Sequence, residues 1–374
     1  MSIELKKILL VTRPIAPPWD EASKNFAYYL AKSVDGFNFS LLTPGIIKDL
    51  PEKASQIPIY SKNHLDWGER LRLLKIAPII KDFDIAHFML TPNKLNTWAF
   101  KTFFTNKKTK TIQTIATLRE DLFSDEDFKK IIFSDLVITY SDYAKNKLEK
   151  IGFGNIVRIY PGIDTGLYSP APKDFATMEL FKIKQTDFVI SYPGEYTRLG
   201  ATDNIVSSLP ELFAKIPNAK FVFACRVKNE KDARKKDEII AILKEKGILE
   251  KIVFTDTFAD MPKIYNFSDV VIFPVANMQG KFDVPLAVIE AMSCAKPVII
   301  SNLPILQEFT SQENSIIIDP KDSSQLNAAI IDLFENKEKC VKIGETAKEY
   351  VEQNFSIKDV AKQYEQAYNN ILKT

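Results

Sequence analysis

Short runs of apolar and β-branched residues alternate with longer amphipathic segments along most of this chain. The runs predicted as strands in the first half are Lys7–Val11, Asn38–Leu42, Ile85–Phe88, Thr111–Ile115, Leu136–Thr139 and Ile156–Tyr160. The segments with helical spacing between them include Ser23–Val34, Leu65–Ile80 and Asp142–Ile151. Strands that alternate with helices favour βαβ units and a parallel sheet. The first half is therefore predicted to be one α/β domain.

A proline-rich segment interrupts this pattern, and a second set of strands follows it. Residues 161–172, PGIDTGLYSPAP, contain three prolines and two glycines, which is typical of a linker between domains. The later strands are predicted at Phe188–Ser191, Lys220–Cys225, Ile252–Thr255, Val270–Phe273, Val298–Ile300 and Ser315–Ile318. The predicted domains are residues 1–170 and 171–355. The last helix, Ser356–Leu372, has apolar residues at helical spacing: Ile357, Val360, Ala361, Tyr364, Ala367, Tyr368 and Ile371.

Length and composition agree with two domains. The chain has 374 residues, of which 45% are apolar and 26% are charged, and single cores stop growing near ~250–300 residues. The net charge is +2 with both signs interspersed, so no overall field indicates nucleic acid. Cys225, Cys294 and Cys340 have no paired spacing and are interpreted as buried thiols. The apolar run Ile8–Val11 is too short for a secretory signal, and we expect a cytoplasmic protein.

The region from Ser268 to Asn302 contains the strongest indication of a binding site. Two β-branched runs, Val270–Phe273 and Pro297–Ile300, flank a helical segment at Pro285–Ser293. A polar loop, Gln279–Val284, follows the first strand. In an open parallel sheet, ligands bind beyond the carboxyl ends of the strands, so this loop is predicted to contact a ligand.

The run VPLAVIEAMSCAKPVI in this region resembles the donor-site segment of retaining glycosyltransferases of family 4, in which two glutamates lie eight positions apart. The resemblance implies the GT-B fold, with two Rossmann-like parallel-sheet domains that face a central cleft and a terminal helix, residues 356–374, that crosses back to the first domain. It also implies that Glu290 holds the ribose hydroxyls of a nucleotide sugar, that the loop Lys281–Val284 holds the transferred sugar, and that Pro285 contacts the donor. Phe282 replaces the first glutamate of the family, and Asp283 follows it.

Other segments match the same family in order. The run YPGIDTGLYSP resembles the motif that closes the first domain of that family. The run DLVITYSDYAKNKL resembles the strand and helix before that motif, and DFDIAHFM resembles a strand that leads to the cleft. EKIVFTDTFADMPKIYNFSDVVIFP resembles the middle of the donor domain. Together these matches span nearly the whole chain.

The phosphate-binding positions depart from the family. The usual Gly-Arg followed by Lys is replaced by Gly194, Glu195 and, at the lysine position, Gly200. Arg198 is the predicted replacement, with Arg226 and Lys228 as further candidates. A leaving diphosphate needs such cations, because negative charge grows on it as the glycosidic bond breaks. Arg198, Lys281 and Asp283 are the predicted catalytic residues. The alternative for Arg198 is a solvated loop cation. For Arg226 and Lys228, the run NEKDARKKDE that follows favours an ordinary charged helix as the alternative.

The first domain also carries candidate site residues. Asp20 and Glu21 stand where many relatives have glycines. One interpretation is that they contact an acceptor or a sugar together with Ser23 and Lys24. The other is that these residues only form a capped helix start with Ser23 as the N-cap. Loops after strands in this sheet are expected at the cleft. The candidates there are His87, Arg119 and Glu120, although a lone strand histidine is more often structural.

Other reaction classes fit the sequence poorly. The chain lacks Gly-x-Gly-x-x-Gly, Gly-x-Ser-x-Gly and a phosphate-binding Gly-Lys-Ser/Thr loop. The acidic run Ser124–Asp127 is interpreted as a helix start, so neither a metal nor a cofactor is predicted.

Two hypotheses remain. One is a retaining glycosyltransferase that uses a UDP- or GDP-linked donor and a glycan or lipid-linked acceptor; the other is a catalytically silent sugar-nucleotide-binding or scaffold protein. Trp19, Trp67, Trp98 and the basic stretch Lys101–Lys110 form either a peripheral membrane contact or a solvated edge.

Overall fold

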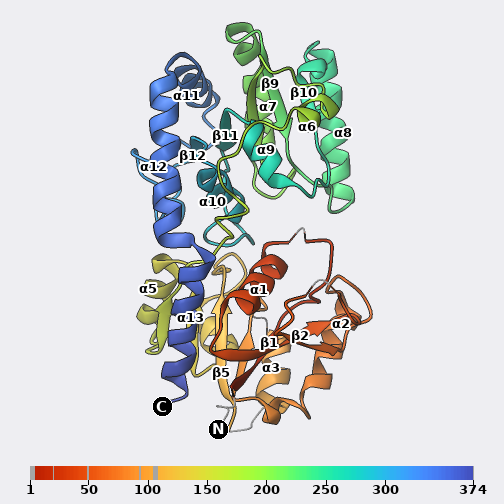
Figure 1. Ribbon diagram of the computed structural model, residues 1–374, viewed down its shortest axis with the longest axis vertical. Coiled ribbons are helices and arrows are strands. Elements are labelled where there is room, and N and C mark those ends of the chain that lie inside the picture. The colour runs from red at the N-terminus through yellow and green to blue at the C-terminus, as the bar shows by residue number, and fades with distance from the viewer. Residues whose placement is uncertain (1–4, 20, 49, 92–93, 104–107, 374) are drawn as a thin grey trace. The chain divides into compact units, whose positions relative to one another are not determined.

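The computed structural model describes residues 5–19, 21–48, 50–91, 94–103 and 108–373, which form two compact units (Figure 1). The first unit comprises Met1–Asp164, Gly280–Asp283 and Phe355–Thr374, and the second comprises Thr165–Gln279 and Val284–Asn354. The first segment of the first unit thus ends in the proline-rich linker, six residues before the predicted boundary at residue 170. The sequence did not predict that Gly280–Asp283 belongs with the first unit.

The first unit is built on a seven-stranded sheet. Its strands are β1 (Lys6–Val11), β2 (Phe37–Thr43), β3 (Ser55–Pro58), β4 (Ile85–Phe88), β5 (Lys110–Ile115), β6 (Leu136–Thr139) and β7 (Ile156–Arg158). They lie in the order β3-β2-β1-β4-β5-β6-β7, and every neighbouring pair is parallel. The six strands predicted in this half are confirmed, whereas the short and polar edge strand β3 was missed.

The residues of β1 show how the sheet is covered on both faces. Ile8 and Leu10 join one core with helix α1 (Ala22–Ser33), and Leu9 and Val11 join a second core on the opposite face. Successive side chains of a strand point to opposite faces, and a parallel sheet is normally buried on both. Further helices of this unit are α2 (Trp67–Arg72), α3 (Lys94–Phe103), α4 (Asp125–Ile131) and α5 (Asp142–Ile151).

The prediction of one continuous helix over residues 65–80 was wrong. The structure has the short helix α2 from Trp67, then 3-10 turns η1 (Leu73–Ile76) and η2 (Ile80–Asp82). Asp66 caps α2 by accepting a hydrogen bond from the Glu69 amide at 2.9 Å. Pro78 lies between the two 3-10 turns, and proline lacks the amide proton that a continuous helix would need there.

The terminal helix packs into the first unit, as the resemblance implied. The chain leaves the second unit in α12 (Lys337–Phe355) and continues into α13 (Ile357–Ile371), drawn in blue in Figure 1. The Ile163 amide donates to the Phe355 carbonyl at 2.8 Å, and the Ile357 amide donates to the Ile163 carbonyl at 2.9 Å. All seven apolar residues predicted on this helix are buried, and they share one core with α1. Their helical spacing was therefore a correct indication of a buried face.

The second unit contains a six-stranded parallel sheet. Its strands are β8 (Phe188–Tyr192), β9 (Ala219–Phe223), β10 (Ile252–Phe254), β11 (Val270–Phe273), β12 (Val298–Ser301) and β13 (Ile316–Ile318). Its helices are α6 (Phe175–Leu180), α7 (Thr202–Lys215), α8 (Glu230–Glu245), α9 (Met261–Phe267), α10 (Leu286–Ser293) and α11 (Ser323–Glu335), together with α12. The order β10-β9-β8-β11-β12-β13 is the doubly wound Rossmann order, and all six strands were predicted.

We predict that Gly162→Ala destabilises the first unit. A Cβ atom at Gly162 would lie 2.8 Å from the Ile357 Cα atom and 3.1 Å from the Val360 Cβ atom, where α13 begins. Overpacking of this kind costs typically ~1–3 kcal/mol. Gly154→Ala is the matched control, because a Cβ atom there would meet nothing within 4 Å. Urea unfolding should show a lower midpoint for Gly162→Ala only, and equal midpoints would contradict the tight contact.

Candidate functional site

Two loops of the second unit meet at the point where its strand order reverses. β8 pairs with β9 on one side and with β11 on the other, so the connections that follow β8 and β11 run in opposite directions. The Ala276 amide, after β11, donates to the Leu199 carbonyl, after β8, at 2.8 Å. The Asn277 side chain donates to the Arg198 carbonyl at 3.4 Å. Ligands of doubly wound sheets bind at such a reversal, so these loops form the candidate site.

Gly194 allows the turn after β8 to fold against a tyrosine ring. A Cβ atom at Gly194 would lie 2.0 Å from the Cζ atom of Tyr192, the last residue of β8. The Tyr192 hydroxyl donates to the Glu195 carbonyl at 3.2 Å and accepts from the Glu195 amide at 3.3 Å. The need for glycine here therefore comes from the close approach of Tyr192, and a bound phosphate is not required to explain it.

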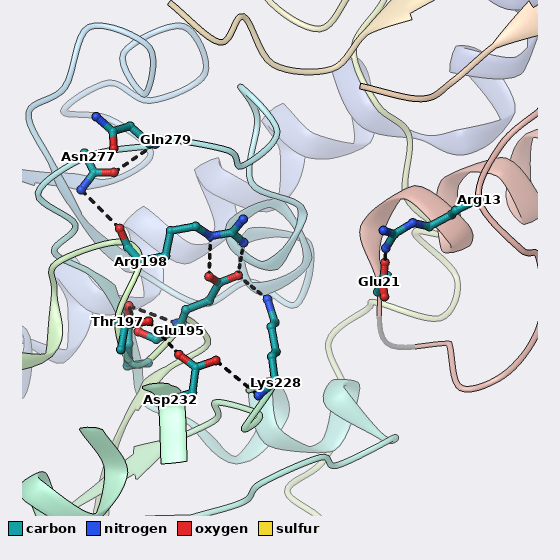
Figure 2. A network of polar contacts seen from close by, with 10 residues as sticks. Arg13, Glu21, Glu195, Thr197, Arg198, Lys228, Asp232, Asn277 and Gln279 are labelled. Atoms are coloured by element: carbon teal, nitrogen blue, oxygen red, sulfur yellow. Dashed lines mark hydrogen bonds and ion pairs between the residues drawn. The ribbon is translucent and has the colours of Figure 1, made fainter. Parts of the chain in front are cut away.

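Glu195 holds two of the predicted phosphate-binding cations. Its side chain is 6% exposed and accepts from Arg198 through Nε at 2.7 Å and through Nη2 at 2.5 Å. The Lys228 Nζ atom donates to the same carboxylate (Figure 2). Burial lowers the pKa of Lys228 against the opposing effect of Glu195, and the charges of Arg226 and Arg198 lower it further. The structure therefore brings Arg198 and Lys228 together around Glu195, and we call these two cations the cation cluster. The charge of Arg226 acts on Lys228, and the phosphate contact predicted for Arg226 stays a prediction.

Asp232 and Thr197 support the cation cluster, and sequence reasoning missed both. Asp232 is buried near the start of α8 and accepts from the Thr197 hydroxyl at 2.8 Å (Figure 2). It also accepts from the Lys228 amide at 3.3 Å. These bonds fix the loop after β8 to the loop after β9. The acidic residues after Lys228 had suggested only an ordinary charged helix.

Glu290 lies on α10 in a different electrostatic setting. It is partly buried and accepts a hydrogen bond from the Tyr265 hydroxyl at 3.0 Å. Burial raises the pKa of Glu290 to about 7, while hydrogen bonds from Tyr265 and Tyr168 lower it. At neutral pH this carboxyl group is thus divided between its two forms. The sequence predicted Glu290 as a site residue but did not identify either tyrosine as its partner, although Tyr265 begins the quoted YNFSDV pattern.

The loop predicted to contact the sugar is anchored in the first unit. Phe282 packs on Tyr140, with ring centroids 5.2 Å apart. Asp283 is buried: its amide donates to the Ala116 carbonyl at 2.9 Å, and its carboxylate accepts from the Ser141 hydroxyl at 2.5 Å. These contacts hold Asp283 within the first unit, and the catalytic role predicted for it stays a prediction. Lys281 is partly exposed beside them.

Val284, the last residue of the predicted loop, and Pro285 belong to the second unit. Val284 is fully buried, and Pro285 is the N-cap residue of α10. The predicted donor contacts of these two residues stay predictions.

The candidate residues at the start of α1 are placed differently from expectation. Asp20 lies outside the described residues. Glu21 is the N-cap of α1 and forms an ion pair with Arg13 (Figure 2), so Ser23 lies in the first turn and is not the N-cap. Lys24 is buried, and its Nζ atom donates to the Ala16 carbonyl at 3.4 Å. Its burial removes the exposed cation that an acceptor contact would use.

The structure also corrects the placement of His87. Its side chain is fully buried, with Nδ1 2.9 Å from the Tyr368 hydroxyl on α13 and Nε2 2.7 Å from the Thr114 hydroxyl. Burial lowers the pKa of His87 to about 3, so the ring is neutral. Both ring nitrogens have structural partners, and the structural alternative for this histidine fits the geometry.

Arg119 and Glu120 follow β5 and are each engaged with neighbours. Arg119 forms a bidentate ion pair with Asp121, with both distances 2.7 Å, and this pair raises the pKa of Arg119. Glu120 accepts from the Tyr143 hydroxyl at 2.5 Å and lies 3.5 Å from the Lys147 ammonium group. Their predicted contact with an acceptor stays a prediction.

The acidic run Ser124–Asp127 and the three cysteines each have a local structural setting. Ser124 and Asp127 form a capping box at the start of α4, which confirms the interpretation of this acidic run as a helix start. No group of three or more potential metal ligands occurs among the described residues. Cys225 and Cys294 are buried as expected, whereas Cys340 is partly exposed.

Comparisons with known proteins agree with this geometry. Residues 176–350, a little under half of the chain, match the family of glycosyl transferases group 1. No match was found among curated protein sequences. Solved structures with the same architecture include HepE from Anabaena in complex with UDP and glucose, at 17% identity and a TM-score of 0.78 over 97% of this chain and 99% of HepE. The chain has the GT-B fold.

Two further GT-B structures cover nearly the whole chain. A sucrose-phosphate synthase from Thermosynechococcus elongatus is 17% identical, with a TM-score of 0.76 over 98% of this chain and 99% of the synthase. A glycosyltransferase from Rickettsia africae is 18% identical, with a TM-score of 0.77 over 100% of both chains. These structures show the GT-B fold over nearly the whole chain, and the sequence match concerns residues 176–350.

We predict that Glu290→Gln stabilises the protein at pH 8 but not at pH 5. The pKa is about 7 in the folded state and near the ordinary value of 4.5 when unfolded, so folding takes up a proton between these pH values. The free energy of unfolding therefore falls as the pH rises through this window. The neutral amide avoids this loss, worth about 1–2 kcal/mol for a partly buried group. Urea unfolding of the wild type and Glu290→Gln at pH 5 and pH 8, with Glu238→Gln as control, measures this difference. An equal change in the free energy of unfolding at the two pH values would contradict the raised pKa of Glu290.

Proposed function

We propose that this protein is a retaining glycosyltransferase of family 4 that moves a sugar from a UDP- or GDP-linked donor to a hydroxyl group of a glycan or lipid-linked glycan. The observation that carries the proposal is the cation cluster at the strand-order reversal of a unit that matches glycosyl transferases group 1. Glu290 lies on α10 of the same unit.

The chemistry of these residues suits a nucleotide-sugar donor. Arg198 and Lys228 carry the positive charge that stabilises a leaving diphosphate, and one well-placed donor of this kind is worth ~10²–10³ in rate. In its ionised form, Glu290 accepts two hydrogen bonds at once, which suits the vicinal hydroxyls of a ribose. The reaction needs no protein base, because the acceptor hydroxyl attacks the anomeric carbon on the face from which the phosphate leaves and gives its proton to that phosphate. It is proposed to need neither a metal nor a cofactor.

A UDP-linked donor is the first choice. HepE has been solved with UDP-glucose, and its fold matches this chain over 97% of the residues. The base-reading contacts of this family are largely backbone and apolar, so a GDP-linked sugar is the second choice.

A catalytically silent sugar-nucleotide-binding protein is the second candidate function. Two observations favour it: Glu195 already neutralises part of the cation cluster, and Phe282, at the position of an acid in the family, packs into the first unit. Such a protein would bind the donor without turning it over.

We predict that UDP or GDP raises the melting temperature of the wild-type protein and has a much smaller effect on Glu290→Ala. A ligand that binds only the folded state stabilises it by ~2.7 kcal/mol at a hundredfold excess over its Kd. Thermal shifts with UDP, GDP, ADP and CMP and their sugar conjugates measure this, with Glu238→Gln as control. No shift with any nucleotide would contradict the proposed donor site.

Turnover separates the two candidates. We expect the enzyme to release UDP or GDP slowly from the donor even without an acceptor. The sugar that is released first should have the same anomeric configuration as in the donor, which proton NMR measures. Binding without release would favour the silent protein.

The proposal includes peripheral contact with an anionic membrane on the cytoplasmic side. Trp67 on α2 and Trp98 on α3 are 63% and 60% exposed, and Leu71, one turn after Trp67, is 51% exposed. Leu73, from the turn that continues α2, and Phe100 of α3 pack into the same core, so both helices cover the same sheet face. Trp19 is partly buried against Tyr28 and is not part of this edge.

The basic stretch after α3 is described only in part. Residues 104–107 lie outside the described residues. Among the helices described, none is both long and apolar enough to cross a bilayer.

We predict that the double variant Trp67→Ser, Trp98→Ser reduces co-sedimentation with phosphatidylglycerol vesicles at low salt. Indole rings favour the membrane interface, and their loss removes apolar contact without changing the protein's charge. Phe175→Ser, which alters an aromatic residue that is 54% exposed in the second unit, is the matched control. Absence of wild-type binding to these vesicles would rule out the membrane contact.

A further inference from the structure

The buried carboxylate of Glu195 forms ion pairs with Arg198 and Lys228, the two cations of the candidate phosphate site. The Glu195 side chain is 6% exposed, whereas those of Arg198 and Lys228 are 41% and 27% exposed. The carboxylate therefore lies beneath two cations that reach the surface. A buried carboxylate needs such partners, because an uncompensated charge in the protein interior is costly.

The contacts that Glu195 makes are those that a phosphate group would make. The Arg198 Nε and Nη2 atoms donate to separate oxygens of the carboxylate, in the fork geometry that arginine also uses with phosphate. The Lys228 ammonium group adds a third donor to one of these oxygens. A diphosphate that uses the same donors must share them with Glu195 or displace it.

Glu195 is also held near the cations by its backbone. The Tyr192 hydroxyl bonds both its amide and its carbonyl, and Thr197 and Arg198 of the same loop are bonded to Asp232 and Asn277. Only side-chain rotation can move the carboxylate away. Even after rotation its negative charge stays close to a ligand bound at Arg198.

We propose that Glu195 is an internal counter-anion of the donor site. It competes with the diphosphate for Arg198 and Lys228, and so it lowers the affinity for the phosphate part of the donor and of the nucleoside diphosphate product. This inference rests on the proposed function. It makes Glu195 a determinant of affinity and product release at the position where the family resemblance implies a cation.

The test is titration calorimetry of wild-type protein, Glu195→Gln and Glu238→Gln with UDP, GDP, uridine and guanosine. Removal of one negative charge beside the phosphates should tighten binding of the preferred diphosphate roughly tenfold, which corresponds to about 1.4 kcal/mol, because like charges in close contact repel each other even at high effective dielectric. Binding of the nucleoside, which has no phosphate, should not change. Glu238→Gln removes an exposed charge elsewhere in the same unit and should match the wild type.

Glu195→Asp gives a second measurement if the glutamine variant does not fold. It keeps the charge but is one methylene shorter, so it cannot hold both cations as Glu195 does, and we expect an intermediate gain in diphosphate affinity.

The possible outcomes separate this inference from the proposed function. Equal or weaker diphosphate binding by either folded variant would overturn the inference, because Glu195 would then position the cations and not compete for them. A gain that is equally large for the nucleoside would also overturn it, since the effect would not involve phosphate. If neither the wild type nor any variant binds a nucleotide, the proposed function itself fails and the inference fails with it.

Discussion

The arrangement of the candidate site depends on the parallel pairing of β8 with both β9 and β11. This pairing makes β8 and β11 the central strands and sends their following connections in opposite directions. The loop after β8 consequently contacts the loops after β9 and β11, which lie about 30 and 80 residues further along the chain. Without this topology Glu195 and Lys228 would not meet.

Two glutamates in the second unit show how environment sets the charge of the same side chain. Glu195 is buried with an arginine and a lysine on its carboxylate. Glu290 has the hydroxyls of Tyr265 and Tyr168 as partners, and burial raises its pKa to about 7. Neutral donors compensate desolvation less than cations do. A ligand at the first residue thus meets existing ion pairs, and a ligand at the second meets a carboxyl group that is easily protonated.

The first unit is completed by segments from distant parts of the sequence. Helix α13 supplies seven buried apolar residues to its core, and the Tyr368 hydroxyl lies within hydrogen-bond distance of His87 on β4. Phe282 and Asp283 return to the same unit and contact Tyr140, Ser141 and Ala116. His87, a candidate for the cleft, is used here to hold the fold together, and Asp283 is bonded within the same unit.

The sequence by itself determined the two parallel sheets, twelve of the thirteen strands in the described part of the chain, and the buried face of α13. These follow from local periodicity and motif spacing, which the chain carries whatever its tertiary contacts. Only the tertiary structure decided that Glu195 pairs with both cations, that Lys24 and His87 are buried, and that Gly280–Asp283 belongs to the first unit. Those outcomes depend on which distant side chains come within hydrogen-bond distance, and burial then sets their charge, which no local pattern specifies.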